Sequence, residues 1–333
     1  MPDSPAAPNP LSLVAPELAA ALEFFPNMDF SNGLEPFRGP LDPKMFPPLP
    51  PELEAVRMEE RFAPGVGGAP DVRMLHYTPP GAEGPPRPAV LHIHGGGYIM
   101  GSPEMTDAAN RTTSLALGIT VVSVDYRLAP ETVWPGAVED CHAALVWMHD
   151  NAAELGIDPE RIAIAGESAG GGHAAALALY ARDRGGPRIR FQMLDAPMLD
   201  DRTGTPQVPG ADPHPHVGHF VWTPDKNRFG WRSLLGVEPG SADVPEAAVP
   251  ARAADVSGLP PTFITVGALD LFLEENLEFI RRLTRAGVPA ELHVIPGAYH
   301  GFGMAQGSPQ VAQVLALKQR ALARALDIVR PQP

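Results

Sequence analysis

Short apolar runs alternate with polar or helix-forming segments over most of the chain. We expect strands at residues 54–62, 71–77, 89–93, 119–124, 161–165, 189–194, 262–266 and 291–295. We expect helices at residues 137–151, 171–180, 273–286 and 311–328. The first two strands, joined by a glycine-rich link, predict an antiparallel start to a sheet. The later alternation of strands and helices predicts a largely parallel sheet covered on both faces.

Two proline-rich regions interrupt this alternation. Residues 1–50 combine prolines with a helix candidate at 11–25, and they hold too many apolar residues for a solvated tail. Residues 197–260 contain their own aromatic side chains, Phe220, Trp222, Phe229 and Trp231. A long insertion of this kind predicts a cap or lid rather than a disordered loop.

Composition narrows the class of protein. The 333 residues include 44% hydrophobic and 19% charged residues, which suits one large α/β domain or two smaller ones. A net charge of −14 argues against nucleic acid or an anionic membrane as a partner. No apolar run has the length of a membrane span, and the start of the chain lacks the basic region of a signal peptide. We therefore expect a cytoplasmic protein.

The chain offers little for metal binding. Its single cysteine, Cys141, excludes an internal disulfide and a cysteine-based metal cluster, and we expect it to be an unreactive core residue of helix 137–151. His214, His216 and His219 have no acidic or cysteine partner at metal-ligand spacing. We expect these histidines to line a pocket or the surface, and we expect no metal site.

Residues 166–170 read Gly-Glu-Ser-Ala-Gly and lie between the strand at 161–165 and the small-residue helix at 171–180. A G-x-S-x-G pattern between a strand and a helix is the sequence form of a nucleophile elbow. The helix N-terminus beneath the serine favours developing negative charge. Alone, the pattern also fits a glycine-rich turn with a surface serine. In this context Ser168 is the first candidate for a catalytic nucleophile.

A second motif, His94-Gly95-Gly96-Gly97-Tyr98, directly follows the strand at 89–93. Three consecutive glycines let backbone N–H groups approach a ligand closely, because no Cβ obstructs them. The alternative is a flexible loop. Because this motif is more specific than the serine pattern, we interpret it as an oxyanion hole.

A serine hydroxyl needs a base to take its proton and a carboxylate to orient that base. Asp270 and His300 each follow a predicted strand, and the chain order Ser, Asp, His is the one expected of an α/β-hydrolase. We therefore predict that Ser168, His300 and Asp270 form a catalytic triad.

Other assignments of the base and the acid are open. Glu274 or Glu275 could replace Asp270, and His293 could replace His300. However, the two glutamates lie in a predicted helix and His293 lies inside a predicted strand, so Asp270 and His300 are favoured.

Taken together, the motifs resemble those of the bacterial hormone-sensitive-lipase-like (family IV) carboxylesterases, over nearly the whole length. The matching segments are residues 94–97, 126–131 and 166–172, the turn at Asp270 and residues 300–302. The resemblance implies an α/β-hydrolase fold, with a mostly parallel eight-stranded sheet flanked by helices and a mainly helical cap. It also implies a division into residues 1–52 (first part of the cap), 53–197 (first part of the catalytic core), 198–258 (cap insertion) and 259–333 (rest of the core).

By the same resemblance, the oxyanion hole uses the N–H groups of Gly96, Gly97 and Ala169. The chain departs from the family at Glu167, where members more often have Asp, and at Tyr98, where they often have Phe. Glu167 keeps the charge but lengthens the side chain beside the elbow. The resemblance implies no metal or organic cofactor, and a monomer or a homodimer.

We therefore predict a serine carboxylesterase that acts on short- to medium-chain esters through an acyl-enzyme. The short cap and its aromatic residues favour small, water-soluble esters over emulsified fat. An amide or carbamate hydrolase would use the same residues, and so would a peptidase, although a peptidase of this fold more often carries a large extra domain. A non-catalytic receptor on this scaffold would be expected to lose a triad member or the glycines, and this chain keeps them all.

Overall fold

The computed structural model describes residues 9–25, 28–38, 48–81, 84–205 and 214–328. Its sheet has eight strands in the order β1-β2-β4-β3-β5-β6-β7-β8. The strands are β1 (Arg57–Ala63), β2 (Val72–Thr78), β3 (Arg87–Ile93), β4 (Thr120–Val124), β5 (Ile157–Glu167), β6 (Phe191–Asp195), β7 (Thr262–Gly267) and β8 (Ala290–Ile295). β2 runs antiparallel to β1 and β4, and the other neighbours are parallel. The predicted fold class is confirmed.

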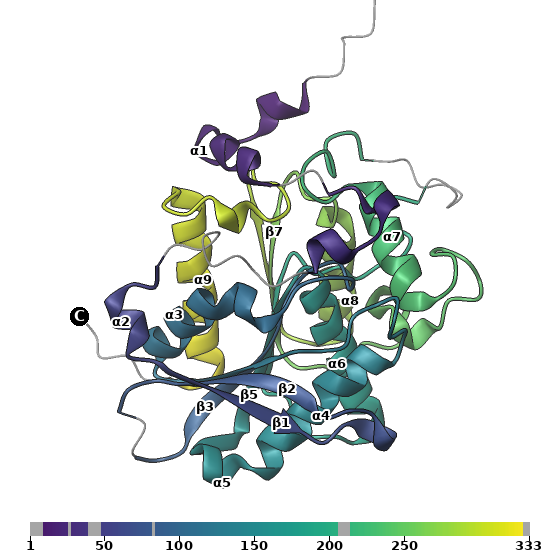
Figure 1. Cartoon of the computed structure of the whole chain (residues 1–333). Helices are drawn as coiled ribbons and strands as arrows, with labels where there is room; N and C mark the ends of the chain where they lie inside the picture. The colour runs from purple at the N-terminus through teal and green to yellow at the C-terminus, as the bar shows by residue number, and fades with distance from the viewer. Residues whose placement is uncertain (1–8, 26–27, 39–47, 82–83, 206–213, 329–333) are drawn as a thin grey trace, which may run out of the picture.

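Helices cover both faces of this sheet. α3 (Asp107–Leu117) and α9 (Pro309–Ala325) lie on one face, and α4 (Gly136–Asp150), α6 (Ala169–Arg184) and α8 (Leu273–Arg285) lie on the other (Figure 1). The side chains of successive residues in β3 point to opposite faces of the sheet. Val90 packs in the cluster that includes Leu322 of α9, and Leu91 packs in the cluster that includes Leu177 of α6. Parallel strands buried on both faces explain the continuous apolar runs in the sequence.

Cys141 lies in α4 and is fully buried, as predicted. Burial raises the pKa of its thiol well above the usual range, because the apolar surroundings disfavour the thiolate. The thiol therefore stays protonated and packs as a small apolar group.

The prediction of one helix over residues 11–25 is wrong. This segment forms a 3₁₀ helix (Pro10–Leu13), α1 (Pro16–Ala19) and a second 3₁₀ helix (Ala20–Phe24). Pro16 has no N–H to continue a helix, and it restricts the residue before it to extended backbone. Ala15 is accordingly extended and donates its N–H to the carbonyl oxygen of Gly297, 3.0 Å away.

The first strand begins later than predicted, because residues around position 54 are helical. α2 (Pro51–Glu54) precedes β1, and its proline occupies the first helical position, where a missing N–H does no harm. Three further α-helices had no predicted range: α3 (Asp107–Leu117), α5 (Ala152–Leu155) and α7 (Pro224–Leu235).

The N-terminal segment and the insertion after β6 meet beyond the carboxyl ends of the strands. Phe30 is buried, and its ring centroid lies 6.3 Å from that of Trp222 and 5.1 Å from that of Phe229. Figure 1 shows α1 and α7 beyond the same end of the sheet. Contacts between aromatic rings therefore join two segments that are far apart in the sequence.

A buried ion pair ties the loop after β4 to α4. The Asp140 carboxylate, only 1% exposed, accepts hydrogen bonds from the N–H of Arg127 at 2.9 Å and from its guanidinium at 2.7 and 2.8 Å. We expect Asp140→Ala to lower the free energy of unfolding by about 3 kcal/mol, because it leaves the guanidinium half-buried without its partner. Urea unfolding of the purified variant measures this change.

Asp150→Ala on the same helix is the matched control, since that side chain is exposed and, among the described residues, its carboxylate pairs only with His149. Its expected effect is within about 0.5 kcal/mol. Equal stability of the two variants would contradict the structural role of the Arg127–Asp140 pair.

Candidate active site

Ser168 occupies the sharp turn between β5 and α6. Its backbone has φ +56° and ψ −122°, a conformation that a non-glycine residue rarely adopts. Three backbone hydrogen bonds hold it there: its N–H donates to Asp195 at 2.8 Å, and its carbonyl oxygen accepts from Gly172 and Met198 at 3.0 Å each. The strained turn is thus fixed by the end of β6 as well as by its own helix.

Glycines make this turn possible because the chain is too close to its neighbours for side chains. A Cβ at Gly170 would lie 2.0 Å from the carbonyl oxygen of Ile93, and a Cβ at Gly166 would lie 2.4 Å from that of Gly170. The start of α6 therefore packs directly against the end of β3.

Ser168, His300 and Asp270 form one chain of hydrogen bonds. Ser168 Oγ lies 2.9 Å from His300 Nε2, and His300 Nδ1 lies 2.8 Å from Asp270 Oδ2. Asp270 and His300 are buried, and Asp270 Oδ1 accepts the N–H of Phe272 at 2.9 Å. Because an ionised carboxylate only accepts, Nδ1 carries the imidazole proton and the Nε2 lone pair faces the serine hydroxyl.

The alternative residues lie elsewhere. His293 Nε2 lies 2.7 Å from Glu291 Oε1 on β8. The buried Glu275 carboxylate accepts the N–H of Leu199 at 2.6 Å, and Glu274 is exposed on α8. The structure brings Asp270 and His300, and not these side chains, to Ser168.

The glycine-rich loop after β3 lies beside the serine. A Cβ at Gly95 would be 3.5 Å from the Cβ of Ser168. Gly96 and Gly97 have φ of +129° and +60°, where glycine is favoured. A Cβ at Gly96 would lie 1.9 Å from the carbonyl oxygen of Met100, so a side chain is also excluded by contact.

Several N–H groups in this region have no intramolecular acceptor within the described residues, among them those of Gly96 and Gly97. Another belongs to Ala169, the first residue of α6, whose N–H has no intrahelical partner. Such N–H groups, together with the positive end of a helix dipole, can bind an oxyanion.

Aromatic side chains support the loop from behind. His94 stacks on Tyr126 with ring centroids 4.2 Å apart, and the Tyr126 hydroxyl donates to the carbonyl oxygen of His94 at 2.8 Å. The Tyr98 hydroxyl donates to the carbonyl oxygen of Met198 at 2.8 Å. Tyrosine in place of phenylalanine at position 98 thus adds a buried hydrogen bond between the loop and the chain after β6.

Glu167 contacts the same loop from the elbow. Its Oε1 accepts the N–H of Gly95 at 3.1 Å, and its Oε2 lies 2.9 Å from His92 Nε2. Sequence reasoning did not single out His92, although a histidine inside an apolar strand is a signal that could have found it. A polar side chain buried in a sheet needs a partner.

Apolar rings flank the triad on the side of the insertion. The ring centroid of Phe272 lies 5.1 Å from that of His300, and that of Trp222 lies 6.5 Å from it. A Cβ at Gly97 would meet Trp222 Cη2 at 2.1 Å. The indole therefore rests directly on the glycine loop.

His214, His216 and His219 of the insertion are half-buried or exposed. The N–H of His216 donates to His214 Nδ1 at 3.2 Å, and His219 Nε2 lies 3.0 Å from the carbonyl oxygen of Pro215. Over the described ranges, no group of three or more His, Cys, Asp or Glu side chains is arranged to hold a metal ion.

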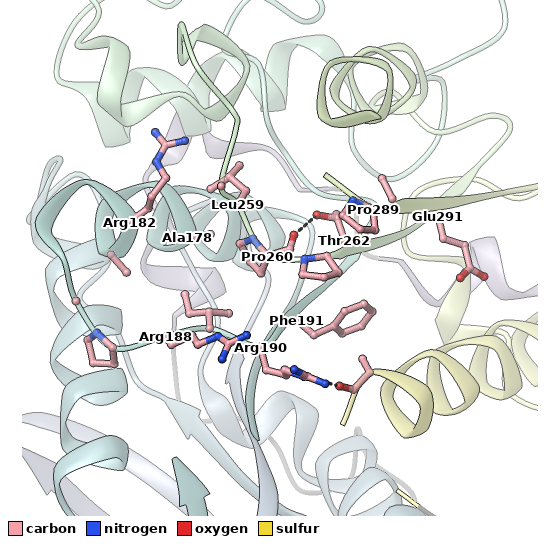
Figure 2. A pocket seen from close by; sticks show the side chains of 18 of the residues that line it. Ala178, Arg182, Arg188, Arg190, Phe191, Leu259, Pro260, Thr262, Pro289 and Glu291 are labelled. Atoms are coloured by element: carbon pink, nitrogen blue, oxygen red, sulfur yellow. Dashed lines mark hydrogen bonds between the residues drawn. The ribbon is translucent and has the colours of Figure 1, made fainter. Parts of the chain in front are cut away.

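A separate cavity of about 670 Å³ lies at the other end of the sheet. Its lining includes Phe191 at the start of β6 and Thr262 at the start of β7, both seen in Figure 2. Ser168 follows the carboxyl end of β5, whereas this cavity lies at the amino ends of β6 and β7. The cavity and the serine therefore lie at opposite ends of the parallel strands. Ligand chemistry in open α/β sheets belongs at the carboxyl edge.

Comparison with known proteins agrees with this geometry. A family model described as the alpha/beta hydrolase fold matches residues 90–304. The chain belongs to this family. The resemblance drawn from the motifs is thereby confirmed. In the part of the chain that is described, no helix is both long and apolar enough to cross a membrane.

Individual relatives match almost end to end. The chain is 36% identical to the carboxylesterase NlhH of Mycobacterium tuberculosis, over 94% of this chain and 96% of that protein. Its structure is similar to that of a bacterial heroin esterase, with a TM-score of 0.86 and 38% identity over 96% of this chain and 99% of the other. The esterase LipW of Mycobacterium marinum gives a TM-score of 0.79 and 30% identity, over 95% of this chain and 96% of that one.

Two buried histidines make stability depend on pH. Burial lowers the pKa of His173, on α6, to about 3 and that of His76, on β2, to about 4. In the unfolded chain both take up protons near pH 6.5. Because the unfolded state binds protons that the folded state excludes, stability falls as the pH drops below about 6.5.

We expect each of these histidines to contribute about 2 kcal/mol to the stability lost between pH 7 and pH 5. His173→Gln removes one titrating group, so its urea-unfolding free energy should fall less over that interval. A loss as steep as that of the wild type would show that His173 does not exclude the proton.

Proposed function

We propose that this protein is a serine carboxylesterase that hydrolyses short- to medium-chain acyl esters. The observation that carries the proposal is the continuous hydrogen-bonded chain from Ser168 through His300 to Asp270, beside N–H groups that have no other acceptor among the described residues. The names of the relatives, carboxylesterase and esterase, support the same chemistry.

In the first step His300 Nε2 takes the proton of Ser168 as Oγ attacks the ester carbonyl carbon. The imidazole becomes positively charged, and the Asp270 carboxylate stabilises that charge through Nδ1–H. The carbonyl double bond opens and its electron pair moves to the oxygen, which gives a tetrahedral oxyanion.

The N–H groups of Gly96, Gly97 and Ala169 are the proposed donors to this oxyanion. They are held in place before substrate arrives, so stabilising the charge requires little reorganisation. Loss of one such donor lowers the rate by about 10²–10³-fold in serine hydrolases.

Collapse of the oxyanion breaks the bond to the alcohol, which leaves after His300 returns its proton. A water molecule then loses a proton to His300 and attacks the acyl-enzyme. The second oxyanion collapses to the carboxylic acid and frees Ser168. His300 accepts or donates the proton in every step, and none of these steps needs a cofactor.

The N-terminal segment and the insertion after β6 form the proposed cap, with boundaries at residues 52, 198 and 258. Trp222 and Phe30 from these segments pack together, and Trp222 lies on the glycine loop. Bulky rings beside the glycine loop and His300 would narrow the proposed acyl site, and this supports the proposed preference for short chains.

The wild type should hydrolyse p-nitrophenyl acetate and butyrate faster than p-nitrophenyl octanoate, and p-nitrophenyl palmitate most slowly. This series tests the acyl-chain preference.

Ser168→Ala tests the nucleophile with the same substrates. The folded variant, checked by circular dichroism, should lose about 10⁶-fold in kcat, because no other group can form the acyl-enzyme. Equal, slow rates for both proteins would overturn the esterase assignment and bring amides and carbamates forward.

Asp270→Asn tests the orienting carboxylate. The amide is nearly the same shape but offers an N–H to His300 Nδ1 in one orientation, which favours the wrong tautomer. We expect kcat to fall by about 10⁴-fold with little change in folding. Glu274→Gln on the exposed part of α8 is the matched control and should retain wild-type kcat. Substantial activity in Asp270→Asn would assign the orienting role to another residue.

A further inference from the structure

We propose that Glu167 is a positioning residue: it holds the loop that carries the oxyanion N–H groups of Gly96 and Gly97 at a fixed position relative to Ser168. The proposal rests on the proposed esterase function. Glu167 directly precedes Ser168, and Gly95, whose N–H it accepts at 3.1 Å, directly precedes Gly96 and Gly97. One side chain therefore joins the segment that carries the nucleophile to the loop that carries two of the proposed donors.

The contact is close along the side chain as well as at its end. A Cβ at Gly95 would lie 3.4 Å from Glu167 Cγ and 2.9 Å from the Glu167 carbonyl oxygen. The two backbone segments thus lie side by side, and a shift of the glycine loop would stretch the hydrogen bond to the carboxylate.

The carboxylate is itself held in place from the opposite side. His92 Nε2 lies 2.9 Å from Glu167 Oε2, and His92 Nδ1 lies 2.9 Å from the hydroxyl of Ser123. These three side chains stand on β5, β3 and β4, which are adjacent in the sheet. Since an ionised carboxylate only accepts, Nε2 carries a proton and the Ser123 hydroxyl can donate to Nδ1.

Glu167 is ionised at neutral pH. Burial alone would raise its pKa, but His92, Lys318 on α9 and the N–H of Gly95 favour the charged form and lower the pKa to about 2. A full negative charge strengthens the hydrogen bond from Gly95, because charge-assisted hydrogen bonds are about twice as strong as neutral ones.

The length of the side chain matters for this geometry. Aspartate would retract the carboxylate by about 1.5 Å, one carbon–carbon bond. From that position it cannot keep its hydrogen bonds to both Gly95 and His92 unless the loop or the strand moves. The glutamate, where aspartate is more common, is thus long enough to reach both His92 and Gly95 in this structure.

A set of variants separates positioning from general stability. Glu167→Gln keeps both hydrogen bonds if His92 changes tautomer, because the amide oxygen accepts from Gly95 and the amide N–H donates to Nε2. Glu167→Asp shortens the link, and Glu167→Ala removes it. Glu291→Ala is the matched control, since Glu291 is also paired with a histidine, His293, but on the outer strand β8.

With p-nitrophenyl butyrate we expect Glu167→Ala to lower kcat by about 10–100-fold at nearly constant KM, because the donors act mainly on the transition state. Glu167→Asp should fall between Ala and wild type, and Glu167→Gln should stay within about threefold of wild type. The inhibition constant of a trifluoromethyl ketone, which forms an oxyanion on Ser168, should rise by the same factor as kcat falls. Glu291→Ala should change neither quantity.

Rates are compared at a temperature where every variant is folded by circular dichroism. The proposal is overturned if Glu167→Ala keeps kcat within threefold, if KM rises in place of a fall in kcat, or if Gln is as damaging as Ala. An inactive wild type would instead overturn the esterase function itself, so the two failures are distinguishable.

Discussion

The structure of the site depends on the contact between the backbone of the serine turn and the ends of the neighbouring strands. Ser168 can hold a positive φ because its N–H donates to the carbonyl oxygen of Asp195 and its own carbonyl oxygen accepts the N–H of Met198. Gly170 also lets α6 touch the carbonyl of Ile93. No side chain fits into this contact. The requirement for small residues extends to Gly172, where a Cβ would lie 2.2 Å from the Tyr98 hydroxyl.

The parallel sheet converts this local geometry into a site assembled from distant segments. β3, β5, β7 and β8 end at the same edge, so the residues that follow them meet there although up to 206 positions separate them (94 to 300). Tight loops then aim each group: the turn at Asp270 is closed by its bond to Phe272, and the glycine loop is closed by hydrogen bonds from Ile99 and Met100 to Gly96. The strands bring the groups together, and the loops set their final orientation.

Much of this could be predicted from the sequence. The predicted ranges locate the eight strands to within a few residues. For the inner strands this is possible because a strand buried on both faces leaves a continuous apolar signature. Ser168, Asp270 and His300, which the structure joins by hydrogen bonds, could be proposed as a triad from the sequence because that chemistry requires these residue types after strands in this order.

What could not be predicted depends on contacts between distant segments. The break at Pro16 is a local signal, but the acceptor of the Ala15 N–H is Gly297, far along the chain. The sequence places Trp222 in an insertion, but it does not show that the Trp222 indole packs against Gly97, more than 100 positions earlier in the chain. The apolar pattern around His92 indicates a buried strand but not the hydrogen-bond partners of the histidine. Those partners, Ser123 and Glu167, come from β4 and β5.

The row formed by Ser123, His92 and Glu167 crosses three strands of a sheet in which one face packs a cluster of apolar side chains. Ser123 and His92 are buried and Glu167 is partly buried. Replacing buried polar groups with well-packed apolar residues is a common route to a more heat-resistant protein. If Glu167 positions the glycine loop as we propose, the same replacement would remove the support of that loop. Attempts to evolve thermal tolerance at these three positions would therefore trade turnover for stability, whereas the surface helices offer changes free of that conflict.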